Sequence, residues 1–158
     1  CMKLLTLLGV AVGGSLIAVI ILFIVKAIDS KQGEALGLVN QQLSACSPKP
    51  NCVSSEAGTP SDKKVAPFTL NSEEAEQDWK RLQAAILAHG GQLVHIDEQY
   101  LAATFTSSLF GFVDDLEARL DTVNNAIQIR SASRVGTSDF GANRTRVELL
   151  RQRYSQAQ

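Results

Sequence analysis

The chain has 158 residues, of which 45% are hydrophobic, and it carries a formal net charge of −1 at pH 7. A chain of this length suits one small domain with a modest core. Near-neutral charge gives no electrostatic case for binding DNA or RNA, so no nucleic-acid partner is expected.

The run from Leu4 to Val25 contains no charged residue. As a helix it would cover a bilayer core of roughly 30 Å at about 1.5 Å per residue, so the sequence predicts a transmembrane anchor over residues 1–26, with membrane lipid as its first partner. The alternative is a cleaved signal peptide ending near Val25-Lys26-Ala27. The apolar region of a signal peptide usually has about 7–15 residues, which favours a retained anchor.

Gly9 and Gly13 form a Gly-x-x-x-Gly pair inside the predicted span. Small residues at this spacing let two helices approach closely, so they predict helix packing against other membrane subunits or a second copy of the chain. Glycine is also common in membrane helices for unrelated reasons, and this alternative stays open.

Residues 27–67 are expected to form a juxtamembrane helix or linker, then a loop containing Cys46 and Cys52, then a flexible stretch. The spacing of the two cysteines is not that of Cys-x-x-Cys sites, and a disulfide is favoured over free thiols or a metal site. A disulfide persists in an oxidising compartment. The chain is therefore expected to cross the bacterial inner membrane once, with its C-terminal domain in the periplasm or, equivalently, in a thylakoid lumen.

Residues 68–158 carry the pattern of a small α+β domain. Helical spacing starts near Ala75, after a possible cap formed by Asn71 and Glu74, and ends at Gly90-Gly91. Two hairpins and a final helix capped by Ser138 or Asp139 follow. The expected fold is a four-stranded antiparallel sheet with two flanking helices on one face. The expected strands cover residues 93–96, 100–106, 113–120 and 126–133.

Strand parity separates the charges of the second hairpin. Asp114 falls on the apolar face, where it needs a donor such as Ser131, Ser133 or a basic residue after Arg134. On the polar face, Arg130 is expected to meet Asp115 or Glu117 across the hairpin.

The stretch from Arg130 to Arg146 gathers arginines and hydroxyl groups at a strand-to-helix turn. Such residues can hold a lipid phosphate or a partner's carboxylates, or they can be consumed in a network that locks the turn. Both readings stay open for the candidate ligand- or partner-binding residues, which are Asp114, Asp115, Arg130, Ser131, Ser133, Arg134, Asp139, Asn143, Arg144 and Arg146.

Three motifs resemble the domain of unknown function 1499 family. They are the run from Cys46 to Ser55, the pair Tyr100–Ala103 and Phe112–Asp115, and the stretch Arg130–Arg134 followed by Gly136, Ser138–Gly141 and Asn143-Arg144. The resemblance covers residues 46–152 and not the predicted span. It implies a bacterial or plastid protein, commonly exported or membrane-attached, with no established enzymatic activity.

Three functions are therefore considered. The first is a non-enzymatic accessory or structural subunit of a membrane complex. The second is a module that binds an anion or anionic lipid through the Arg130–Arg146 stretch. The third and least favoured is a hydrolase that uses Asp114 or Asp115 with His89 or His95; no catalytic motif, metal or cofactor is expected.

Overall fold

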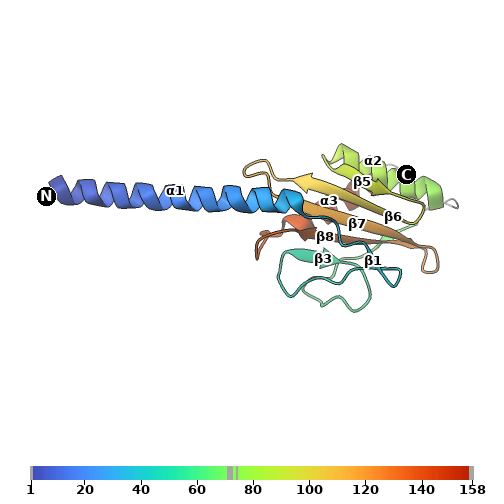
Figure 1. Cartoon of the computed structure of the whole chain (residues 1–158). Helices are drawn as coiled ribbons and strands as arrows, with labels where there is room; N and C mark the ends of the chain where they lie inside the picture. The colour runs from blue at the N-terminus through green and yellow to red at the C-terminus, as the bar shows by residue number, and fades with distance from the viewer. Residues whose placement is uncertain (1, 71–72, 74, 157–158) are drawn as a thin grey trace.

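The computed structural model describes residues 2–70, 73 and 75–156, with side chains described from residue 13 onward. The expected cap formed by Asn71 and Glu74 lies outside the described residues. Figure 1 shows a long helix that leaves one end of an α+β domain.

The long helix is α1 (Met2–Gln32), which continues beyond residue 26, where the anchor was expected to end. Within the described side chains, Gly13–Gln32 is long and apolar enough to cross a membrane, and only 11% of its apolar window is buried in the protein. This low burial distinguishes α1 from the core helix of a globular domain, because such a helix would be mostly covered.

The main sheet is antiparallel throughout and has six strands, so the expectation of four was wrong. Five strands lie in the order β3-β8-β7-β6-β5, and a sixth, β4, also pairs with β8. The strands are β3 (Cys52–Ser54), β4 (Phe68–Thr69), β5 (Gln92–Ile96), β6 (Tyr100–Thr106), β7 (Val113–Asp121) and β8 (Ala126–Ser133).

The four strands that the sequence predicts are β5 to β8, and both hairpins are confirmed. Asn125, in the β7–β8 turn, has a φ of 50°, a conformation that asparagine tolerates in hairpin turns. β3 and β4 were missed because each has only two or three residues and lies in or beside a polar loop, where no alternation can be recognised.

Both helices of the domain pack on the same face of the sheet, as predicted. α2 (Ala75–Ala88) and α3 (Ala142–Gln156) share one core cluster with the sheet. The cluster's fully buried side chains include Leu82, Ile86, Leu116, Ile129 and Leu150. This face fixes α3, and with it the polar residues at its start, against β8.

The opposite face is partly covered by residues 33–45, which form a two-stranded ribbon rather than a juxtamembrane helix. β1 (Leu38–Val39) and β2 (Gln42–Leu43) pair across a turn in which Asn40 and Gln41 have φ values of 51° and 62°. Leu43 packs with Tyr100 and Ala102 in a second small cluster. The chain between α1 and the disulfide is therefore folded onto the sheet.

Candidate functional site

The candidate residues gather at one end of the β7–β8 ladder, where α1 also meets the domain. Asp114 and Asp115 lie on β7 and pair with Ser133 and Ala132 of β8. Arg134 and Asp139 lie in the β8–α3 loop, and Asn143, Arg144 and Arg146 lie on α3. Because successive strand residues point to opposite faces, the set divides into two groups.

The first group lies between the sheet and α3 and is centred on Asn143, which is fully buried. Arg146 donates to Asp114 at 2.6 Å, to Ser131 Oγ at 3.0 Å and to Asn143 Oδ1 at 2.6 Å. The guanidinium also lies over the ring of Phe105, 4.7 Å from its centroid. Asp114 therefore meets a basic residue after Arg134, one of the donors that strand parity predicts for it.

Asn143 connects the rest of this group. Its Nδ2 donates to Ser133 Oγ at 3.1 Å, to Asp139 Oδ2 at 2.8 Å and to the backbone carbonyl of Asn51 at 3.1 Å. Asp139 also accepts from the backbone amides of Gly141 and Asn143, so it caps α3 as predicted. The contacts join β3, β8 and the start of α3.

The second group lies on the opposite face of the sheet and consists of arginine–carboxylate pairs. Arg130 donates to Glu117 at 2.5 Å, and both side chains are buried. Arg134 holds Asp115 through two hydrogen bonds of 2.9 and 2.7 Å, and this carboxylate raises the pKa of the arginine. Of the two carboxylates expected for Arg130, the structure selects Glu117, because the two residues are cross-strand neighbours.

The predicted candidate residues did not include Glu56 or Arg119, and Glu117 was expected only as an alternative partner of Arg130. Arg119 donates to Glu56 at 2.6 and 3.0 Å, and this partner raises the pKa of Arg119. The alternation of Asp115, Glu117 and Arg119 along one strand face was the available signal. Glu56 lies 63 positions away from Arg119 in the chain and gave no local signal.

These pairs also hold the chain between α1 and the disulfide. Glu117 accepts from the backbone amide of Gly37 at 2.7 Å, and Glu56 accepts from that of Leu43 at 2.9 Å. Arg134 donates to the carbonyl of Ser30, at the end of α1, at 3.1 Å. One member of each pair, Glu117, Glu56 or Arg134, therefore has a second partner that fastens residues 30–43 to the sheet.

Arg144 is placed differently from the other arginines. It donates to the carbonyls of Lys64 and Asp62 at 2.9 and 2.7 Å, so it fastens the loop after β3 to α3. The separate loop before β3 is closed by the disulfide between Cys46 and Cys52, whose Cα atoms lie 5.7 Å apart. The predicted disulfide is confirmed.

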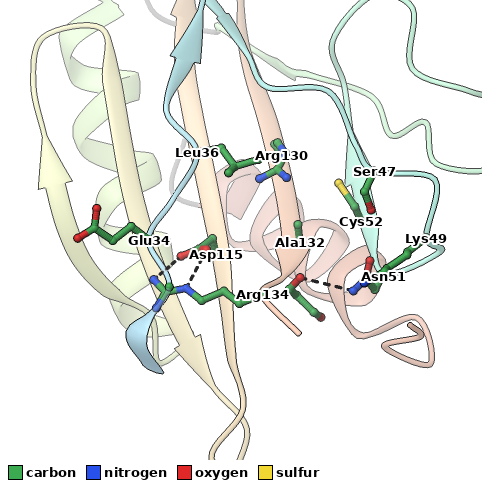
Figure 2. A pocket seen from close by; sticks show the side chains of 12 residues that line it. Glu34, Leu36, Ser47, Lys49, Asn51, Cys52, Asp115, Arg130, Ala132 and Arg134 are labelled. Carbon is green, nitrogen blue, oxygen red and sulfur yellow. Dashed lines mark hydrogen bonds and ion pairs between the residues drawn. The ribbon is translucent and has the colours of Figure 1, made fainter. Parts of the chain in front are cut away.

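A pocket of about 300 Å³ opens beside the second group, and Figure 2 shows Arg130, Arg134 and Asp115 along its floor. Glu34 and Leu36 form one wall, and Lys49 and Asn51 come from the other side. Arg130 Nε is the one buried side-chain nitrogen or oxygen without a hydrogen-bond partner within the described part of the chain. The lining carries charges of both signs and does not define one ligand.

The two histidines lie apart from the carboxylates that a hydrolase would use. His95 contacts Asp97 at 3.3 Å on the surface. His89 lies against the Phe105 ring, and burial together with the nearby charges of Arg153 and Arg146 lowers its pKa. Over residues 2–70, 73 and 75–156, no described hydrogen bond joins either histidine to Asp114 or Asp115, and no cluster of three or more His, Cys, Asp or Glu could hold a metal.

The fold and the site define a small α+β domain carried on one long apolar helix, with its charged groups joined in an internal network. Residues 42–153 match the family described as "Protein of unknown function (DUF1499)", and the chain belongs to this family. The match begins in β2 and ends in α3, so α1 lies outside it. No curated protein and no solved structure matches the chain.

Proposed function

We propose that this protein is a non-enzymatic accessory or structural subunit of a membrane protein complex. In this proposal α1 crosses the membrane once, and the domain lies on the extracytoplasmic face. The observation that carries the proposal is the joint between α1 and the domain, because it gives the domain a fixed position relative to the helix.

The joint is made by the last turns of α1. Ala27 is 4% exposed and Ser30 is fully buried. Ser30 Oγ accepts from the backbone amide of Val113 at 3.1 Å, while Arg134 binds the Ser30 carbonyl. Gly33 follows with its Cα close to Arg134, since a Cβ there would lie 2.9 Å from Cδ of that side chain. A mobile tether would need none of these contacts.

The same contacts support a retained helix over a cleaved signal peptide. Cleavage near Ala27 would remove Phe23, whose ring stacks on Phe110 at 4.8 Å. It would also cut the chain beside Ser30, which is packed inside the domain. The end of α1 therefore serves as part of the folded domain.

The positions of the glycines on α1 favour the packing of a partner helix against it in the membrane. Ala27, which packs on the domain, follows Gly9 by five turns at about 3.6 residues per turn, so both positions lie on the same side of the helix. Gly13 is one turn from Gly9, and an added Cβ at Gly13 would meet nothing within 4 Å. A partner helix packed along Gly9 and Gly13 would therefore lie on the side of α1 that contacts the domain. The domain would then cover the end of the partner helix.

The disulfide supports the extracytoplasmic side. A Cys46–Cys52 bond persists where the surroundings are oxidising, as in a bacterial periplasm or a thylakoid lumen. The paired arginines support a rigid domain, because Arg130, Arg134 and Arg146 each hold a carboxylate within the domain.

The test is mild detergent extraction from native membranes, followed by mass spectrometry of co-purified proteins and lipids. We expect a stoichiometric set of membrane proteins that is lost in the double variant Gly9→Ile/Gly13→Ile. Gly14→Ile is the matched control, because Gly14 also has open space around it and lies on another side of α1. Purification of the wild type without any other membrane protein would contradict the proposal.

A retained anionic lipid would instead favour the binding-module hypothesis. In that case Arg134→Ala and Arg144→Ala should lower the amount of lipid, and Arg153→Ala, at an exposed position of α3, should not. Lipid retention that is equal in all three variants would contradict a role for the Arg130–Arg146 stretch.

A further inference from the structure

Two loops leave the domain at the end where α1 meets it. Asp114 of β7 pairs with Ser133 of β8, so the loop before β7 (residues 107–112) and the loop after β8 (residues 134–141) share that end. The hydrogen bond between Val113 and Ser30 places α1 beside them. In Figure 1 both loops project from the domain toward the side to which α1 extends.

Both loops carry exposed apolar side chains. Leu109 is 80% exposed and Phe110 is 37% exposed in the first loop, and Phe140 is 99% exposed in the second. Phe140 has a φ of 53°, a conformation in which bulky residues are rarely found. An uncovered aromatic side chain held in a strained turn points to a role outside the fold.

The depth of the first loop follows from its contact with α1. Phe110 stacks on Phe23 with ring centroids 4.8 Å apart, and Phe112 meets the same ring at 6.0 Å. Phe23 is the third residue from the end of the charge-free run, so it lies about 3 Å inside that end at 1.5 Å per residue. If α1 crosses the bilayer, the Phe110 ring lies at the edge of the hydrocarbon layer.

The charges around the two loops are compatible with a position at the edge of the hydrocarbon layer. Residues 107–112 carry no charge. The carboxylate of Asp139 in the second loop accepts from the amides that begin α3, and it is therefore occupied inside the domain. Lys26 and Lys31 are exposed on the adjacent turns of α1, where long basic side chains can reach phosphate groups.

We propose that this end of the domain inserts into the outer surface of the phospholipid bilayer, with Leu109, Phe110 and Phe140 among the headgroups and upper acyl chains. The inference rests on the membrane placement of α1 proposed above. It gives the domain a second attachment to the membrane, independent of any partner helix. Phenylalanine and leucine are typical of the apolar side of segments that lie in the membrane surface.

The test places tryptophan at single exposed positions of the full chain in phosphatidylcholine vesicles with brominated acyl chains. L109W and F140W probe the two loops. L16W, on the exposed surface of α1, is the control for the span. V123W is the control for water, because Val123 is 92% exposed in the turn at the opposite end of the β7–β8 ladder. Trp79 is 4% exposed and is common to all variants.

The measurement is the loss of tryptophan fluorescence caused by bromine. We expect this loss to be much larger for L109W and F140W than for V123W, and close to the loss for L16W. Quenching of L16W without L109W would overturn the inference while leaving the anchor in place. Quenching of L109W without F140W would overturn the role of Phe140. If L16W also escapes quenching, α1 does not lie in the bilayer, and both this inference and the proposed function fail.

Discussion

The Arg130–Glu117 ion pair is buried on the face of the sheet opposite α2 and α3. Glu117 is fully buried and accepts from Arg130, from the Tyr100 hydroxyl at 2.8 Å and from the Gly37 amide. Removing one member of a buried ion pair leaves the other charge desolvated without its counter-ion. The pair therefore joins β7, β8 and the chain after α1 in one unit.

Arg130→Met is expected to lower the free energy of unfolding by about 3 kcal/mol, because it leaves the Glu117 carboxylate buried without its cation. Adding Glu117→Leu should recover part of this loss, giving a strongly non-additive double-mutant cycle. The measurement is chemical unfolding of the full chain in mild detergent. Arg153→Met, at an exposed site on α3, is the matched control and should change stability by less than about 0.5 kcal/mol. Additive effects of Arg130→Met and Glu117→Leu would contradict the pairing.

Two buried tyrosines predict a loss of stability at alkaline pH. Burial raises the pKa of Tyr154 to about 12, and burial with the adjacent Glu117 carboxylate raises that of Tyr100 above its usual value. A raised pKa favours the protonated phenol in the folded state. Its stabilising contribution is therefore complete below the ordinary pKa of about 10 and falls as pH rises through the folded value.

The corresponding test compares wild type with Tyr154→Phe. The variant is expected to lose about 1 kcal/mol at neutral pH, because its hydroxyl no longer donates to the Thr69 carbonyl, but to lose less stability than wild type between pH 10 and pH 12. The measurement is the free energy of unfolding of both proteins at several pH values in this range. Parallel curves for the two proteins would mean that Tyr154 does not contribute to the alkaline loss.

The residue contacts were predictable where local periodicity governs them. Strand parity placed Asp114 on the apolar face and Arg130 on the polar face with Asp115 and Glu117. The choice of Glu117 as the partner of Arg130 came from the hairpin register in the structure. The partner of Arg119 is Glu56, which reaches it through the fold of the loop after β3. A single sequence carries no periodic signal for such a contact.

At the scale of elements, the disulfide closes the loop of residues 46–52, and the short strand β3 joins the end of this loop to the sheet. Cys52 begins β3, is 2% exposed and pairs with Ala132 of β8. The bond to Cys46 closes a short loop, and the entropy of closure in the unfolded chain gives it a stabilising effect of about 2 kcal/mol.

Reduction of wild type is therefore expected to lower the free energy of unfolding by about 2 kcal/mol. The variant Cys46→Ser/Cys52→Ser should start at the lower value and show no response to the reductant. The measurement is unfolding with and without dithiothreitol under the same detergent conditions. A response of the double variant to reductant, or none in wild type, would argue against this stabilising role.

The joint between α1 and β7 is the second element-scale feature that can be tested alone. Ser30→Ala removes the acceptor of the Val113 amide, so hydrogen exchange at that amide should accelerate while the centre of β7 stays protected. Ser108→Ala, in the adjacent exposed loop, is the control. Unchanged exchange at Val113 would show that the joint does not depend on Ser30.

The elements that sequence reasoning recovered are the long ones. α2, α3 and strands β5 to β8 have a clear period and recognisable turns. The ribbon over residues 38–43 and strands β3 and β4 have two or three residues each, and pairing with β8 or with each other creates them. Their formation depends on neighbours that are distant in the sequence, so propensity alone does not indicate them.

At the scale of the whole molecule, contacts at Ser30 and Arg134 join the domain to the long apolar helix α1. The charged groups that could serve as a surface site are instead paired within the domain, and they fasten the chain after α1 to the sheet. A binding role for the candidate residues stays a prediction, and their contacts with residues 30–43 were not predicted. These connections depend on how the chain after α1 runs along the sheet, which no local pattern indicates.

The most direct measurement is the distance between a spin label on α1 and one on the far end of the domain. Labels at Leu16→Cys and Val123→Cys, in a Cys1→Ser background with the Cys46–Cys52 bond intact, report this distance in lipid nanodiscs. A narrow distance distribution is predicted, because Ser30, Arg134 and Phe23 hold the helix to the domain. A broad distribution would mean that the domain moves freely on a tether, and it would contradict the account of a rigid accessory subunit.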